Sequence, residues 1–135
     1  MARFEGNLAE TLLAAAKGER ASVDPQWGAP ASLCVVLASE GYYPGPHPKG
    51  RPITGVADAE ALEGVTVFQA GTRRQGETLV TAGGRVLTVT AVGDSIDQAA
   101  ERAYAAADRI HFEGRQLRRD IGWQARSSTA PRGAS

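Results

Sequence analysis

Two adjacent arginines near the end of the chain form the motif with the clearest chemical potential. Arg118 and Arg119 stand directly before Asp120, and Gly122 follows two residues later. Arginine forks match the oxygens of a phosphate group, and a glycine lets an anion approach the backbone closely. The same residues also fit a solvated charge cluster in which an arginine pairs with Asp120. The motif therefore predicts a phosphate-binding site on Arg118, Arg119 and Gly122, with the surface cluster as the alternative.

Four further residues are candidates for the same anion site. Gly71 and Thr72 follow a predicted strand and could offer backbone and hydroxyl donors to a ribose or a phosphate, although a tight turn explains them equally well. Lys49 lies in a loop rich in glycine and proline, from which it could reach an anion or simply face solvent. Arg85 follows a pair of glycines and could add a cation at the mouth of the site. We expect these four residues to bind substrate.

The residues that usually carry catalysis or metal binding are poorly placed for either. Neither His47 nor His111 has a partner at metal-ligand spacing. Cys34 lies within an apolar run, which favours a buried core residue over a nucleophile. We therefore predict no metal site and no catalytic residue within this chain.

Length and charge limit the classes of protein that the chain can belong to. Its 135 residues suit one domain, and its 15 basic and 15 acidic side chains cancel. A neutral chain lacks the long-range field of a nucleic-acid or membrane binder. A single cysteine permits no internal disulfide, and no apolar stretch approaches the roughly 20 residues of a membrane span. We expect a cytoplasmic protein without nucleic-acid or membrane partners.

The elements that must position these residues follow from periodicity and turn signals. Apolar residues at helical spacing predict helices over residues 4–18 and 96–110, the second behind the capping pattern of residues 95–98. Residues 32–38 and 65–68 read as strands. Residues 79–81 and 85–92 read as a hairpin closed by a glycine turn, and residues 41–50 hold three prolines and three glycines and form a loop.

This order of elements predicts an α+β fold. A small, mostly antiparallel β-sheet would carry a helix across one face, with a further helix beside it. We place one domain at residues 1–125 and a disordered tail at residues 126–135, because the tail is polar and rich in small residues.

Five segments, taken in order, resemble the C-terminal domain of the phosphoribosylamine–glycine ligase family. They are residues 8–18, 31–38, 67–72, 81–87 and 118–123, which read LAETLLAAAKG, ASLCVVLA, VFQAGT, TAGGRVL and RRDIGW. The resemblance runs from about Arg3 to Ala125. Two departures stand out: the loop at residues 41–44 has one tyrosine more than the family's Gly-Tyr-Pro, and Gln69 stands where a histidine is typical.

The resemblance implies a fold like the C-terminal domain of biotin carboxylase, a barrel-like β motif called a rudiment hybrid motif. The family consists of ATP-grasp ligases of purine biosynthesis that join glycine to phosphoribosylamine through a glycyl phosphate, with ATP and magnesium. Arg118 and Arg119 would then hold the phosphate of phosphoribosylamine or glycinamide ribonucleotide, and Asp120 would orient an arginine.

The ATP-grasp portion of such a ligase would lie almost entirely before residue 1. We therefore expect no cofactor in this chain, a need for an ATP-grasp portion in cis or in trans, and no ligase activity from the chain alone. Two other functions stay open: a stand-alone binding module for a phosphorylated sugar or nucleotide, without catalysis, and a purely structural or assembly role that uses an apolar face.

Overall fold

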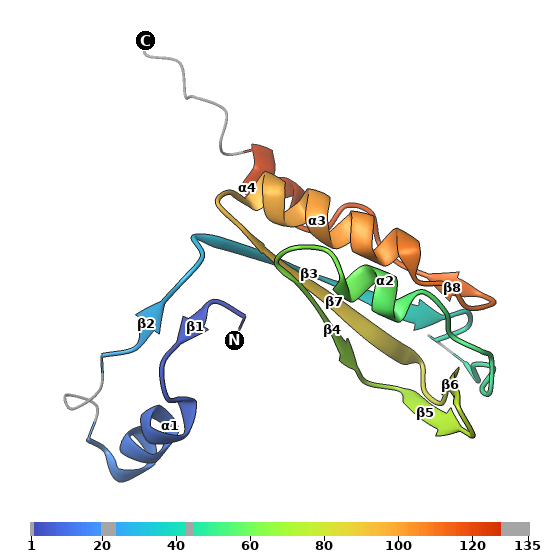
Figure 1. The fold of residues 1–135 in the computed structure, drawn as a ribbon, viewed down its shortest axis with the longest axis horizontal. Helices are drawn as coiled ribbons and strands as arrows, with labels where there is room; N and C mark the ends of the chain where they lie inside the picture. Colours follow the sequence, from blue (N-terminus) through green and yellow to red (C-terminus); the bar gives the residue numbers. More distant parts are fainter. Residues whose placement is uncertain (1, 20–23, 43–44, 128–135) are drawn as a thin grey trace.

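The computed structural model describes residues 2–19, 24–42 and 45–127, and it confirms the predicted α+β class (Figure 1). In chain order the elements are β1 (Phe4–Glu5), α1 (Leu8–Lys17), β2 (Gln26–Trp27), β3 (Ala31–Ser39), α2 (Val56–Glu60), β4 (Val65–Gln69), β5 (Thr72–Gln75), β6 (Thr78–Thr81), β7 (Arg85–Gly93), α3 (Ile96–Arg109), β8 (Arg115–Gln116) and α4 (Trp123–Ser127). None of the helices described is long and apolar enough to cross a bilayer.

The central sheet has the strand order β4-β7-β3-β8, and every pairing in it is antiparallel. Alternate residues of β3 are buried: Leu33, Val35 and Leu37. They lie opposite Ala91, Val89 and Leu87 of β7, which are also buried. Since side chains alternate between the faces of a sheet, these residues form one continuous apolar face.

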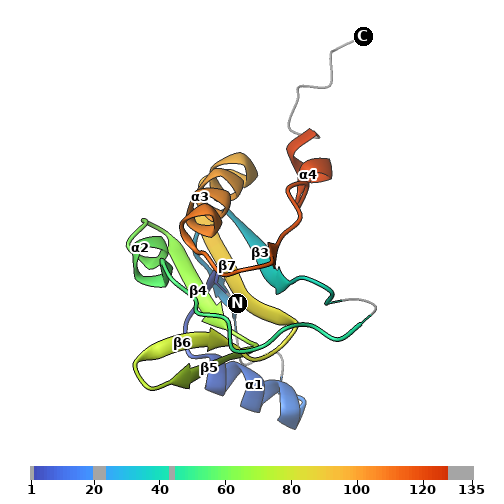
Figure 2. The ribbon, with the colours of Figure 1, turned by 90° about the vertical axis from the view of Figure 1, so that its right-hand side faces the viewer.

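Helix α3 covers this apolar face of the sheet (Figure 2). It begins after Ser95, whose hydroxyl accepts a hydrogen bond from the backbone N–H of Gln98, as the capping pattern predicts. The side of the helix that faces the strands is made of alanines: Ala99, Ala100, Ala103, Ala106 and Ala107. Such small side chains let the helix lie close to the large residues of β3 and β7.

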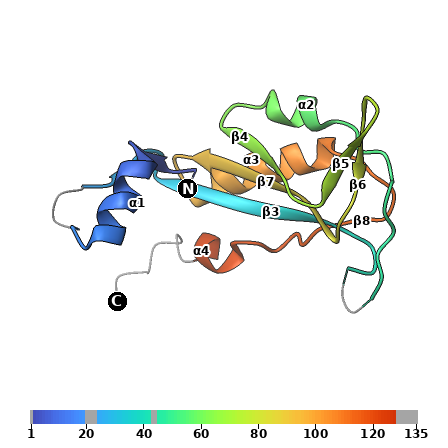
Figure 3. The ribbon, with the colours of Figure 1, turned by 90° about the horizontal axis from the view of Figure 1, so that it is seen from below.

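The opposite face of the sheet is open. Figure 3, seen from below, shows β3 in front of β7 with α3 behind them, and no helix of the described chain crosses this face. Cys34 lies here and is exposed, so the prediction of a buried cysteine was wrong. The apolar run around Cys34 forms a strand, and alternate residues of a strand lie on opposite faces of the sheet. Cys34 lies on the same face as Val36, which is 39% exposed.

The predicted hairpin between residues 79–81 and 85–92 was also wrong. Strand β6 pairs with β5, and β7 pairs with β3 and β4. The long β7 belongs to the centre of the sheet, while the small β5–β6 hairpin stands at its end. Gly71 and Gly83 meet backbone to backbone where the hairpin joins the sheet, because a Cβ on Gly71 would lie 2.7 Å from the Cα of Gly83.

The first helix starts later than the periodicity of its apolar residues predicts. Gly6 has φ +125°, and Asn7 caps the helix by accepting hydrogen bonds from the N–H groups of Ala9 and Glu10. Phe4 therefore lies outside α1, in β1, where its ring meets Trp27 edge-on at 5.7 Å between centroids. The spacing of the apolar residues favoured a helix through Phe4, but a capping residue behind a glycine sets the start.

Two predicted segments lie partly outside the described residues. The described part of the loop at residues 41–50 holds neither helix nor strand, and positions 43–44, with the additional tyrosine, are not described. The predicted tail began at Arg126, but Arg126 belongs to α4, and its Nε donates to Asp97 Oδ1 of α3 at 2.6 Å. Residues 128–135 are outside the described structure.

Candidate functional site

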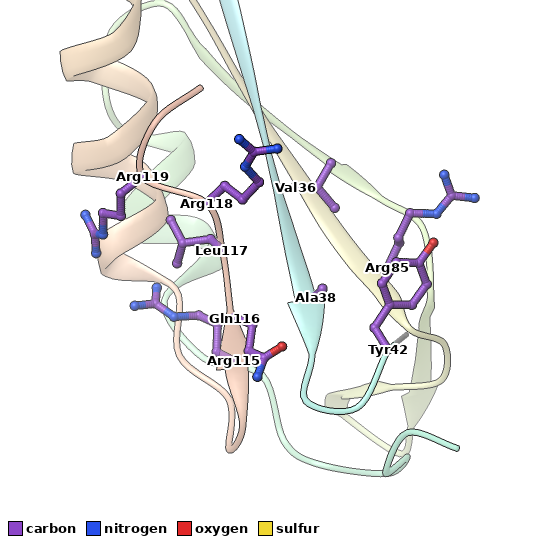
Figure 4. A pocket seen from close by; sticks show the side chains of 9 residues that line it. All are labelled: Val36, Ala38, Tyr42, Arg85, Arg115, Gln116, Leu117, Arg118 and Arg119. Atoms are coloured by element: carbon purple, nitrogen blue, oxygen red, sulfur yellow. The ribbon is translucent and has the colours of Figure 1, made fainter. Parts of the chain in front are cut away.

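A hollow of about 690 Å³ lies on the open face of the sheet, at the end of β3 that pairs with β8 (Figure 4). It is bordered by Val36, Ala38, Tyr42, Arg85, Arg115, Gln116, Leu117, Arg118 and Arg119. A second hollow, of about 510 Å³, shares Val36, Tyr42 and Arg85 with it and extends to Gly71. The two hollows together bring the cations of β7 and of the segment after β8 to one surface.

A bulge in β7 turns Arg85 toward this surface. The register between β3 and β7 shifts between Leu37, which pairs with Leu87, and Ala38, which pairs with Arg85. Val86 is the extra residue, and both Val86 and Leu87 are fully buried. In a regular strand, with Val86 opposite Ala38, strict alternation would put Arg85 on the same face as Leu87, which α3 covers. The bulge therefore lets a charged residue face the hollow.

The segment after β8 directs the two arginines of the motif to different partners. Arg115 donates to the carbonyl oxygens of Ala107 and Ile110 at the end of α3. Gln116 and Arg118 point to the hollow side in Figure 4, whereas Arg119 points to the helix side. Because Arg118 pairs with Asp120 and Arg119 pairs with Asp108 of α3, the two guanidinium groups do not meet at one ligand in this conformation.

Arg118 is 73% exposed and already holds a carboxylate in a two-pronged geometry. Its Nε donates to Asp120 Oδ1 at 2.9 Å, and its Nη2 donates to Oδ2 at 2.6 Å. The hydrogen bond from Arg118 lowers the pKa of Asp120, and the same bond raises the pKa of the guanidinium. The fork is therefore charged, and it is oriented by a planar oxyanion next to the hollow.

Arg119 is held by α3 instead. Its Nη1 and Nη2 donate to Asp108 Oδ2 and Oδ1 at 3.0 and 2.5 Å, and its guanidinium lies 5.8 Å from the centroid of the Tyr104 ring. The hydrogen bond from Arg119 is the main cause that lowers the pKa of Asp108. Although Arg119 borders the hollow, its charge is directed at the helix.

Tyr104 fixes the backbone that carries the motif. Its hydroxyl donates to the carbonyl oxygen of Arg118 at 3.1 Å and accepts from the N–H of Ile121 at 3.0 Å. Gly122 then turns the chain with φ +77°, where a Cβ would lie 2.8 Å from Leu33 Cδ1. Gly122 is thus required by the turn and by packing.

The remaining candidates divide between the hollows and the surface beyond them. Gly71 borders the second hollow, but its N–H donates to the carbonyl oxygen of Arg85 at 2.7 Å. The Thr72 hydroxyl donates to Gln69 Oε1 at 3.1 Å. Thr72 and Lys49 border neither of these hollows, and Lys49 is exposed. Of the cations predicted for the site, Arg118 and Arg85 flank the hollow with their side chains.

The residues missed by the sequence analysis are Ala38, Tyr42, Asp108 and Gln116, together with Tyr104. Arg119 is separated from Arg118 by its pair with Asp108, eleven residues earlier on α3, and no local signal in the motif predicts that pair. Among the residues that the structure describes, no group of three or more histidine, cysteine or acidic side chains could hold a metal ion.

Comparison with known families gives a match over most of the chain. Residues 32–124 match the model of the family described as phosphoribosylglycinamide synthetase, C domain. A phosphoribosylamine–glycine ligase of Caulobacter vibrioides is 49% identical over 127 residues, which are 93% of this chain and 29% of that protein. The chloroplastic phosphoribosylamine–glycine ligase of Arabidopsis thaliana is 46% identical, with 93% of this chain and 24% of that protein covered.

A solved structure agrees with these sequence matches. The crystal structure of phosphoribosylamine–glycine ligase from Thermotoga maritima superposes with a TM-score of 0.62 at 33% identity. The match covers 84% of this chain and 28% of that one. The chain thus spans less than a third of the length of these relatives.

Proposed function

The chain belongs to the phosphoribosylglycinamide synthetase C-domain family, and from this premise we propose that it is the C-terminal part of a phosphoribosylamine–glycine ligase. In this role it contributes the wall of the active site that binds the phosphate of phosphoribosylamine or of the product glycinamide ribonucleotide. ATP and magnesium bind the ATP-grasp portion of the ligase, in cis or in trans, and glycine is activated there.

The geometry of Arg118 carries this proposal. Its fork holds the carboxylate of Asp120 by two parallel hydrogen bonds, and it does so beside a hollow of about 690 Å³. A phosphate group presents the same pair of oxygens with more charge, so it can take the place of the exposed carboxylate. Arg85 adds a second cation across the hollow. Arg119, tied to Asp108, supports the motif from the helix side.

An anchor on the phosphate serves the chemistry of amide formation. The amine of phosphoribosylamine must lie within about 3 to 3.5 Å of the acyl phosphate, in line with its carbonyl carbon, before it can attack. The reacting amine itself offers few groups for the protein to bind. A phosphate clamped at the far end of the sugar fixes the amine's position, because the ribose between them is short and stiff.

The partner portion needs a surface to bind, and the chain offers apolar side chains for one. Leu12 and Leu13 of α1 are 60% and 55% exposed, and Trp27 is 58% exposed. Exposed large apolar side chains in a small protein favour a protein interface. We assign the exposed side chains of Leu12, Leu13 and Trp27 to contact with the ATP-grasp portion.

Calorimetric titration tests the phosphate site on the isolated chain. We expect ribose 5-phosphate or glycinamide ribonucleotide to bind, and Arg118→Ala to weaken binding about tenfold or more, since hydrogen bonds to charged groups contribute about 1.5–3 kcal/mol. Arg74→Ala is the matched control, because it removes the same charge from exposed β5. Wild-type affinity in Arg118→Ala, or no binding at millimolar ligand, would refute the phosphate site.

Reconstitution tests the wider role. The chain alone is expected to release no phosphate from ATP with glycine and phosphoribosylamine, and a separately produced ATP-grasp fragment is expected to gain ligase turnover when this chain is added. Leu12→Ser together with Leu13→Ser should weaken the gain. Ligand binding without any gain in turnover would favour the stand-alone binding module instead.

A further inference from the structure

We propose that Ala38 is a positioning residue: its small side chain forms the floor on which the sugar ring attached to the phosphate lies, between Arg118 and Arg85. This inference rests on the proposed function, because it takes the phosphate to lie at Arg118. It adds residues that neither the motifs nor the family match singles out.

The register of the sheet places Ala38 in the middle of a row of three. Ala38 of β3 pairs with Arg85 of β7 on one side and with Gln116 of β8 on the other. Neighbouring strands lie about 4.8 Å apart, so the two flanking backbones are about 10 Å from each other. Long polar side chains thus stand on both sides of a methyl group, and the space above the methyl group is the hollow (Figure 4).

The size of the hollow exceeds what a phosphate ion occupies. Sites for small organic ligands typically enclose about 300–1,000 Å³, and this hollow measures about 690 Å³. Val36, two residues before Ala38 on the same face, is 39% exposed and extends the apolar floor. A floor made of Ala38 and Val36 suits the C–H surface of a sugar ring, whereas a phosphate ion would gain nothing from it.

The borders of the hollow suit hydroxyl groups. The Gln116 amide both donates and accepts, and the Tyr42 phenol does the same. The ring of Tyr42 is held against the backbone, because a Cβ on Gly84 would lie 2.1 Å from Tyr42 Cδ2. Figure 4 shows the ring beside Arg85. A phosphate at Arg118 would place the attached sugar over Ala38, with its hydroxyls toward Gln116, Tyr42 and Arg85.

The test compares ribose 5-phosphate with inorganic phosphate on the same variants, by calorimetry. Ala38→Leu should weaken the binding of ribose 5-phosphate at least tenfold and leave that of inorganic phosphate within about twofold, because leucine fills the ring position and keeps every cation. Ala9→Leu, which makes the same change at an exposed position of α1 outside both hollows, should bind both ligands as the wild type does. Gln116→Ala removes an exposed side chain without filling the hollow, and it should weaken ribose 5-phosphate severalfold while leaving inorganic phosphate unchanged.

Three results would overturn the ring subsite. In the first, both Ala38→Leu and Gln116→Ala bind ribose 5-phosphate as the wild type does. In the second, each variant weakens the binding of ribose 5-phosphate and of inorganic phosphate equally. In the third, the wild-type chain binds ribose 5-phosphate no more tightly than inorganic phosphate. The second variant keeps the test valid if Ala38→Leu fails to fold. Arg118→Ala separates this inference from the proposed function, because full binding by that variant refutes the phosphate site itself.

Discussion

Replacing Tyr104 with phenylalanine removes one oxygen atom from the point where α3 holds the arginine motif. The hydroxyl makes two hydrogen bonds, to the carbonyl oxygen of Arg118 at 3.1 Å and from the N–H of Ile121 at 3.0 Å. Each contributes about 0.5–1.5 kcal/mol net, so we expect Tyr104→Phe to lower the free energy of unfolding by about 1–3 kcal/mol. For a domain of this size, the loss corresponds to a fall in Tm of roughly 4 °C per kcal/mol. The ring, and its contact with Arg119, would remain.

Urea unfolding followed by circular dichroism measures the loss, and titration with ribose 5-phosphate measures its effect on the site. Binding should weaken more than threefold, because the backbone of Arg118 loses the hydroxyl that positions it. Tyr42→Phe is the control for stability, since it makes the same chemical change on a ring that is 43% exposed, and a shift within about 0.5 kcal/mol is expected there. The reasoning is refuted if Tyr104→Phe is as stable as the Tyr42→Phe control.

Two further changes probe the supports of the site. The hydrogen bond from Arg119 lowers the pKa of Asp108 in the folded state. The stability that this pair contributes is therefore fully present above the pKa of the unfolded carboxyl, and it is lost as the pH falls through the lower folded-state pKa. Urea midpoints should therefore differ between wild type and Asp108→Asn at pH 7 and converge below about pH 4, and an unchanged gap at low pH would contradict this. Gly71→Ala should lower the free energy of unfolding by about 1–3 kcal/mol, because its Cβ would lie 2.7 Å from the Cα of Gly83. Gly45→Ala, whose Cβ meets nothing closer than 3.9 Å, should unfold like wild type, and equal thermal unfolding of both glycine variants would remove the packing argument.

Local signals were sufficient for the elements whose own residues decide them. The capping pattern at Ser95 and the apolar spacing behind it predicted α3 nearly to the residue, because the cap and the helical face lie within one segment. Strand pairing depends on residues far apart in the chain. The glycines at positions 83 and 84 favour a hairpin, yet β7 pairs with β3 and β4, since its buried residues fit the centre of the sheet better than its edge.

The sequence by itself determined the family, the α+β class and the presence of an arginine pair next to a glycine. Only the tertiary structure decided which arginine faces the site. Asp108 of α3 binds Arg119 and holds it on the helix side. A bulge at Val86 brings Arg85 of β7 to the same hollow as Arg118. These outcomes depend on register and on contacts between distant segments. The physical reason is that residue type sets what a side chain can bind, whereas sheet register sets which side chains can bind together.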